Sequence, residues 1–101
     1  MGRSSQRKGA DWERTVARWL RENGIEARRS GVAGQTDGDL VTDLPFQFEC
    51  KNQKDQTAAI REGLEQLGGQ SGVVVVKRRG RSDPGDALVV MTLRGWLDAM
   101  T

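Results

Sequence analysis

The chain is 101 residues long, with 16 basic and 14 acidic residues and a formal net charge of +2. This length allows one domain, and the longest apolar run, Val73–Val76, is far shorter than the ~20 residues that cross a bilayer, so we expect neither a membrane span nor a signal peptide. The sequence has no histidine and a single cysteine, Cys50. Histidine-based catalysis and an internal disulfide are therefore excluded, and a cytoplasmic location is expected.

Basic residues gather in three clusters, one near the N-terminus, one ahead of a glycine-rich stretch and one between two apolar runs. The members are Arg3, Arg7 and Lys8; Arg28 and Arg29; and Lys77, Arg78, Arg79 and Arg81. Basic clusters on a nearly neutral chain favour a polyanionic partner such as nucleic acid. Ordinary solvated surface charge is the alternative interpretation of each cluster.

The N-terminal part of the chain predicts an arm followed by a helix. Residues 1–9 are small, polar and basic and are predicted to form a flexible arm ahead of one domain, residues 10–101. The helix is predicted to start after Asp11, as N-cap, and to stop at Asn23–Gly24. Its apolar residues have helical spacing: Trp12, Val16, Trp19 and Leu20. Glu13 lies at the edge of the buried arc.

Three short strands are predicted next, over residues 25–29, 39–42 and 46–51. A glycine-rich loop, residues 30–38, separates the first two, and Leu44-Pro45 marks a tight turn between the second and third. The third strand alternates between two faces. Phe46, Phe48 and Cys50 share one face, and Gln47, Glu49 and Lys51 share the other. We expect Cys50 to be a small buried hydrophobe.

The rest of the chain predicts a second helix, two strands and a last helix. Asp55 can cap the second helix, and Val73–Val76 predicts a strand buried on both faces. Residues 87–91 form the last strand, and Thr92 caps the last helix. Apolar residues that we expect to face inward are Ile60, Leu64 and Leu67 in the second helix and Leu93, Trp96, Leu97 and Met100 in the last. The predicted fold is α/β, in the order αβββαββα.

Two carboxylates and a lysine are predicted to meet at one end of the hairpin. A turn near residue 44 brings Asp39 beside Glu49, and Glu49 and Lys51 share a strand face. Neighbouring carboxylates repel unless a cation lies between them, and oxygen ligands favour Mg²⁺ or Mn²⁺. Gln53 extends the same face. The alternative is an exposed Glu49–Lys51 pair, with Glu13 a solvated helix acid.

Asp39 followed by Glu49-Cys50-Lys51 resembles the D…(D/E)-x-K signature of the PD-(D/E)XK nuclease superfamily. Glu13 on the preceding helix matches a glutamate that many members carry there. The basic pair Arg28-Arg29 with Ser30, ahead of the aspartate, is similar to the archaeal-type Holliday junction resolvases. The likeness covers roughly residues 10–100. The proline usual before the aspartate is replaced by Gly38, which leaves Asp37 as a rival; Asp39 is preferred because apolar strand residues follow it directly.

The resemblance implies a restriction-endonuclease-like fold, with a central mixed five-stranded sheet and helices on both sides. It implies that Asp39 and Glu49 bind Mg²⁺, with Mn²⁺ as a substitute, that Glu13 contacts the metal or its water, and that Lys51 orients the nucleophile or stabilises charge. DNA-binding residues would be Arg3, Arg7, Lys8, Arg28, Arg29, Ser30, Lys77, Arg78, Arg79 and Arg81.

The expected activity is a DNA endonuclease that makes paired nicks in four-way junctions as a homodimer, with the dimer contact between residues 87 and 100. Neither a membrane nor a small-molecule cofactor is expected. The expected location is the cytoplasm, at the nucleoid or, for a viral protein, in the host. The alternatives are a flap, nicking or repair nuclease of the same superfamily, and a non-catalytic DNA-binding module on the same fold.

Overall fold

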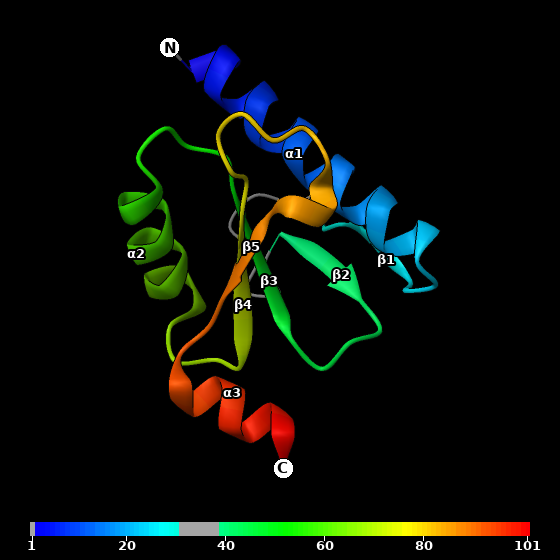
Figure 1. Ribbon diagram of the computed structural model, residues 1–101, viewed down its shortest axis with the longest axis vertical. Helices are drawn as coiled ribbons and strands as arrows, with labels where there is room; N and C mark the ends of the chain where they lie inside the picture. Colours follow the sequence, from blue (N-terminus) through cyan, green and yellow to red (C-terminus); the bar gives the residue numbers. More distant parts are fainter. Residues whose placement is uncertain (1, 31–38) are drawn as a thin grey trace.

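A five-stranded mixed sheet with a helix on each face forms the body of the protein (Figure 1). The structure, a computed structural model, describes residues 2–30 and 39–101, with side chains from Lys8 onward. Its elements are α1 (Gly2–Glu22), β1 (Ala27–Arg29), β2 (Leu40–Thr42), β3 (Gln47–Lys51), α2 (Gln56–Leu67), β4 (Gly72–Val76), β5 (Leu88–Val90) and α3 (Leu93–Met100). The predicted α/β class and the order αβββαββα are confirmed. Within the described residues, no helix has the length and apolarity to cross a membrane.

The strands lie in the sheet in chain order, from β1 to β5. All neighbours are antiparallel except β3 and β4, which are parallel because α2 connects them as a crossover. The hairpin of β2 and β3 pairs Leu40 with Phe48, so its turn is centred on residue 44, as predicted. β1 and β5 are the two edge strands.

The strand β4 separates two hydrophobic cores, because all five of its residues are buried and their side chains alternate between the faces. Val73 and Val75 pack with α1, whose Trp12 donates from its indole nitrogen to the Val75 carbonyl at 3.3 Å. Val74 and Val76 pack with α2. The prediction of a strand buried on both faces is confirmed.

Close contact between α2 and β4 depends on Gly63, since a Cβ at this position would overlap the Val74 side chain. The buried residues of α2 are therefore Ala59, Gly63 and Leu67, while Ile60 and Leu64 are only partly buried beside them. Asp55 caps the helix as predicted: its carboxylate accepts from the Ala58 amide at 3.0 Å. Gly68, at φ 57°, ends it.

The first helix starts earlier than predicted, at Gly2 instead of after Asp11. Residues 2–9 therefore continue α1, and the prediction of a flexible arm is wrong for this described part of the chain. Extending an existing helix is much cheaper than nucleating one, and Gly9 costs only about 1 kcal/mol relative to alanine. Asp11 then lies within the helix, where its carboxylate pairs with Arg14 at 3.0 Å.

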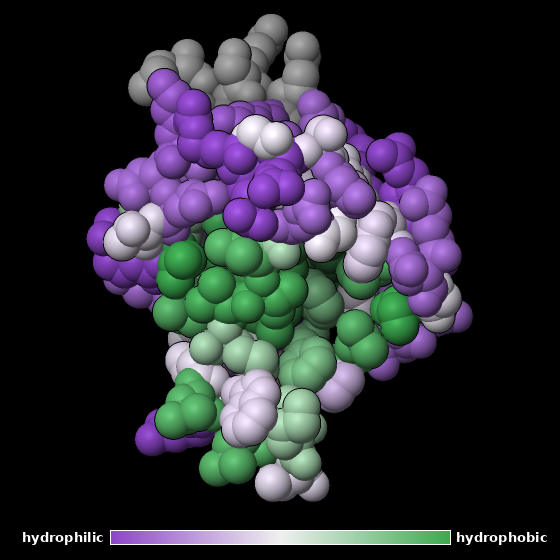
Figure 2. Space-filling view, in the orientation of Figure 1, coloured by the Kyte–Doolittle hydropathy of each residue, from purple (hydrophilic) through white to green (hydrophobic). Residues whose placement is uncertain are grey.

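The last helix also differs from the prediction. Thr92 caps α3 as expected, its hydroxyl accepting from the Gly95 amide at 2.9 Å. The four large apolar residues predicted to face inward are exposed instead: Leu93, Trp96, Leu97 and Met100. Figure 1 shows the reason, because α3 extends beyond the end of the sheet and away from both cores. Hydrophobic side chains thus gather around β5 and α3, and hydrophilic ones gather at the opposite end of the molecule (Figure 2).

Candidate nuclease site and the adjoining basic pocket

The predicted meeting of Asp39 and Glu49 at the end of the hairpin is confirmed. Asp39 directly precedes β2, and its carboxylate oxygen Oδ2 accepts from the Cys50 amide at 2.7 Å. Its own amide donates to the Phe48 carbonyl at 2.7 Å. These two bonds fasten Asp39 to β3 on both sides of Glu49, so the position of this carboxylate is set by the backbone of the neighbouring strand.

Glu49 is buried, with 5% of its surface exposed, whereas the alternation of β3 predicted a more open face. The reason is α2, which covers that face of β3. The Gln47 amide donates to Oε2 of Glu49 at 3.2 Å. Burial raises the pKa of Glu49, and the carboxylates of Asp39 and Glu13 raise it further, while the Gln47 hydrogen bond and the Lys51 charge lower it.

Glu13 projects from α1 toward the same site but is already paired. Its Oε1 accepts from the Arg29 guanidinium at 2.9 Å, in a half-buried ion pair between α1 and β1. Arg29, predicted to bind phosphate, is therefore joined to a predicted site carboxylate. Ser30, the next residue, donates from its amide to the Asp39 carbonyl at 3.0 Å, which connects β1 to the start of β2.

Glu13 and Asp39 line an open pocket of about 600 Å³, whereas the buried Glu49 is not among the lining residues that the structure describes. The lining residues come from α1, from the hairpin end and from α2: Lys8, Gly9, Glu13, Asp39, Cys50, Lys51, Asn52, Gln53, Glu62 and Gln66. Sequence reasoning missed Asn52 and Glu62. The signal in the sequence was the order strand, helix, strand over β3, α2 and β4. This order favours a parallel pair of strands, whose connecting helix crosses one face of the sheet beside β3.

Cys50 is buried as predicted, and burial raises the pKa of its thiol well above the ordinary value. Among the residues that the structure describes, no group of three or more histidine, cysteine or acidic side chains is arranged to hold a metal ion. The donor set for a cation is thus Asp39 and Glu49. Asp39 accepts a hydrogen bond from the protein with Oδ2, and Glu49 accepts one with Oε2. The other oxygen of each carboxylate, Oδ1 or Oε1, is the candidate ligand.

A second pocket, of about 370 Å³, lies beside the first and is strongly basic. Its lining residues are Lys8, Asn52, Gln53, Lys54, Lys77, Arg78, Arg79, Gly80, Arg81 and Ser82. The third predicted basic cluster therefore meets one residue of the first cluster, together with Lys54, which sequence reasoning missed. The Lys77 ammonium also lies 5.9 Å from the centre of the Trp12 ring, in a cation–π contact.

Among the predicted DNA-binding residues whose side chains the structure describes, Arg28, Arg29 and Ser30 lie outside this pocket. Arg28 is exposed on β1 and lines a separate groove with Arg21 and Val41. The side chains of Arg3 and Arg7, and Asp37 as the rival of Asp39, lie outside the described part of the chain.

Of the three tryptophans, only Trp12 belongs to the core. Trp19 lies beside the turn at Gly85 and is partly exposed, and Trp96 is exposed on α3.

The chain matches none of the known family models, curated proteins or solved structures with which it was compared. The protein thus has an α/β fold with a mixed five-stranded sheet, and the chemistry of its site follows from the residues themselves.

Proposed function

We propose that the protein is a metal-dependent DNA endonuclease, with its active site at the end of the β2–β3 hairpin. The observation that carries the proposal is that Asp39 and Lys51 line a pocket that shares walls with a basic pocket, and that the buried Glu49 carboxylate is close enough to Asp39 for the two charges to interact. Metal-assisted cleavage of a phosphodiester in DNA uses both kinds of group. The acidic pocket can hold a cation, and the basic pocket can hold the neighbouring phosphates.

The residues present fit a Mg²⁺ ion. Asp39 and Glu49 are close enough for one carboxylate to raise the pKa of the other, and a cation between them would remove that repulsion. Their oxygens are the hard ligands that Mg²⁺ or Mn²⁺ prefers, and Mg²⁺ commonly binds through one or two carboxylates while keeping several waters. A bound cation would polarise the phosphodiester and lower the pKa of its water.

The other residues would position and balance charge around that centre. Lys51, on the same side of β3 as Glu49, would neutralise negative charge that develops on the phosphate oxygens. Glu13 would accept a hydrogen bond from a water in the pocket with the oxygen that Arg29 does not engage. Arg29 would act as a positioning residue, because its ion pair fixes the Glu13 carboxylate at the edge of the site.

Within this class we propose a Holliday junction resolvase that acts as a two-fold dimer. Two paired nicks require two sites on one junction, and each chain supplies one. The exposed apolar residues of α3 and β5 would form the contact. Leu93, Trp96, Leu97 and Met100 follow the spacing i, i+3, i+4, i+7, which is the same in both directions, so an antiparallel second copy of α3 offers a matching stripe.

The amount of surface supports this contact. Together with Leu88 and Val89 on the edge strand, the side chains of α3 put six exposed large apolar residues at one end of the molecule, where a stable complex buries about 800 Å² of each partner. An isolated helix of eight residues is also unstable in water without a partner surface.

The test is a cleavage assay on four-way junction, flap, linear duplex and single-stranded DNA, with Mg²⁺ and with EDTA. We expect metal-dependent paired nicks in the junction and much slower cleavage of linear duplex. Mixed dimers of wild-type and Glu49→Gln chains should leave singly nicked junctions. Equal cleavage of duplex and junction by a monomer would remove the resolvase assignment and leave the nuclease.

The second candidate is a DNA-binding module without catalysis. The observation that favours it is the engagement of Glu13 by Arg29, which leaves Asp39 and Glu49 as the only carboxylates of the described site for a cation. Such a module would bind DNA equally well in Mg²⁺ and in EDTA and would leave every substrate intact.

A further inference from the structure

The acidic and basic pockets share three lining residues, Lys8, Asn52 and Gln53. Lys8 comes from α1, and the two amides come from the segment that follows β3. Two pockets with common walls form one groove. A linear ligand that occupies the acidic part therefore continues past these three residues into the basic part.

The chemistry of the basic pocket defines what it can bind. Among the described residues that line it there is neither a carboxylate nor an aromatic ring. Its polar groups are mostly donors: the ammonium groups of lysines, the guanidinium groups of arginines and the amides of Asn52 and Gln53. Such a surface suits a series of anions and offers no ring for stacking a base. The ligand class is a polynucleotide strand held by its sugar–phosphate backbone.

We propose that Lys8, with Asn52 and Gln53, binds the phosphate adjacent to the scissile one, and that the basic pocket takes the next phosphates of the same strand. The inference rests on the proposed function, because only that function puts a scissile phosphate at Asp39 and Glu49. It deepens the function by giving the strand a path, from the hairpin end past α1 toward the turn after β4.

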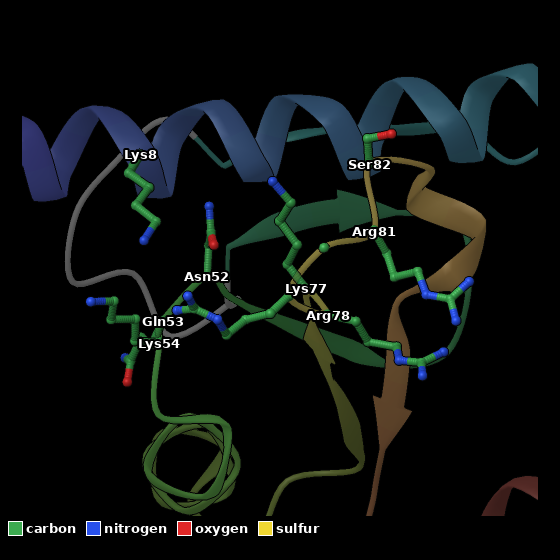
Figure 3. A pocket seen from close by; sticks show the side chains of 10 residues that line it. Lys8, Asn52, Gln53, Lys54, Lys77, Arg78, Arg81 and Ser82 are labelled. Atoms are coloured by element: carbon green, nitrogen blue, oxygen red, sulfur yellow. The ribbon is translucent and has the colours of Figure 1, made fainter.

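Lys8 is suited to this position because it stands on a helix. Figure 3 shows its side chain extending from α1 toward the Asn52–Lys54 segment, and Lys77 extending from the end of β4 toward α1. Arg78 and Arg81 point away from Lys8, toward the far side of the pocket. A lysine on a formed helix loses less conformational freedom on binding than one on a flexible arm. The start of α1 at Gly2 thus makes Lys8 part of the groove.

The first part of the experiment measures binding without cleavage. Wild type, Lys8→Ala, Lys8→Arg and the control Arg18→Ala are titrated with a four-way junction in EDTA at several salt concentrations. Arg18 is exposed on the same helix and lies outside both pockets. We expect Lys8→Ala to bind roughly three- to tenfold more weakly and to lower the salt slope by about 0.9, the value for one phosphate contact. Lys8→Arg and Arg18→Ala should stay near wild type.

The second part tests whether Lys8 contacts the phosphate next to the scissile one. Cleavage is measured in Mg²⁺ on two junctions, each with a single neutral methylphosphonate, placed on one side of the cut in the first and on the other side in the second. For wild type, neutralising one neighbouring phosphate should slow cleavage by the same factor as Lys8→Ala. In Lys8→Ala, that junction should show no further loss, because the two changes remove the same interaction.

Two results would overturn the inference: losses that multiply in the combined case, or an Arg18→Ala loss equal to that of Lys8→Ala. If wild type cleaves nothing while Lys8→Ala still weakens binding, the nuclease proposal and the adjacency both fail, and the groove binds backbone without cutting it. Failure of the proposed function is therefore distinguishable from failure of the groove.

Discussion

The two ends of the molecule differ in whether their side chains find partners within one chain. At the hydrophilic end, the charged groups of the candidate site have partners within one chain: Glu13 with Arg29, Glu49 with Gln47, and Asp39 with the Cys50 amide. At the other end, Leu93 is 79% exposed and Met100 is 65% exposed. The polar site is thus arranged within a single copy, whereas the apolar end needs a second surface.

This difference follows from what each kind of group requires. A buried carboxylate needs a partner where it lies, since leaving it unpaired costs several kcal/mol. An exposed apolar side chain costs less in the monomer and gains on association. Changes at the hydrophilic end should therefore alter chemistry and binding, and changes at the apolar end should alter assembly.

The largest effect is expected at the carboxylates. Asp39→Asn, Glu49→Gln and Lys51→Ala should each slow DNA cleavage by about a thousandfold or more, because each removes a metal ligand or a balancing charge worth several kcal/mol in the transition state. In the two carboxylate variants DNA binding should stay the same or become tighter, since both changes remove negative charge. Single-turnover cleavage and equilibrium binding in EDTA give the two values.

Asp37→Asn is the control for this set and should have a much milder effect. If Asp37→Asn abolishes cleavage while Asp39→Asn does not, the assignment of the metal-binding aspartate is wrong. Loss of DNA binding together with cleavage in Glu49→Gln would contradict a role limited to metal and charge.

The second effect concerns the apolar end. Trp96→Arg should weaken dimerisation at least about thirtyfold, because an aromatic residue at the centre of a contact commonly contributes more than 2 kcal/mol. Sedimentation should show a dimer for wild type at micromolar concentration and a monomer for the variant. The far-UV circular dichroism spectrum should keep most of its helix signal, since α1 and α2 supply most of the helical residues and do not depend on α3.

Asp98→Asn is the control for this prediction and should leave the dimer intact, because Asp98 lies on the side of α3 away from the apolar stripe. A wild-type protein that sediments as a monomer would contradict the proposed contact.

A smaller effect is expected in the basic pocket. Arg78→Gln combined with Arg79→Gln should reduce the slope of log affinity against log salt by up to about 1.8, or 0.9 for each phosphate that the protein no longer neutralises. Preference among DNA sequences should not change. Arg28→Gln is the matched control, because Arg28 lines a groove away from this pocket. An unchanged slope in the double variant would make Arg78 and Arg79 ordinary surface charge.

The smallest effect concerns the first turns of α1. Gly9→Ala should raise the free energy of unfolding by up to about 1 kcal/mol, because alanine is the better helix former and an added Cβ meets nothing within 4 Å. Chemical denaturation followed by tryptophan fluorescence measures it. No change would mean that the helix before Asp11 contributes nothing to the stability of the domain.

The sequence by itself determined the elements whose reasons are local. The alternation of β3 separated Phe48 and Cys50 from Glu49 and Lys51, and the caps at Asp55 and Thr92 set two helix starts. The four consecutive valines predicted a strand with two covered faces. The spacing of Asp39 and Glu49 about a turn at residue 44 was enough to bring the two carboxylates together.

Tertiary structure decided what depends on contacts between distant segments. Only the packing of α2 on β3 buries Glu49, and only the approach of β1 to α1 pairs Arg29 with Glu13. The amphipathic pattern of α3 indicates an apolar face but not its partner, so it predicted burial where the structure has exposure. The shared groove at Lys8 likewise arises from three segments that the sequence keeps far apart, because pockets form where such segments meet.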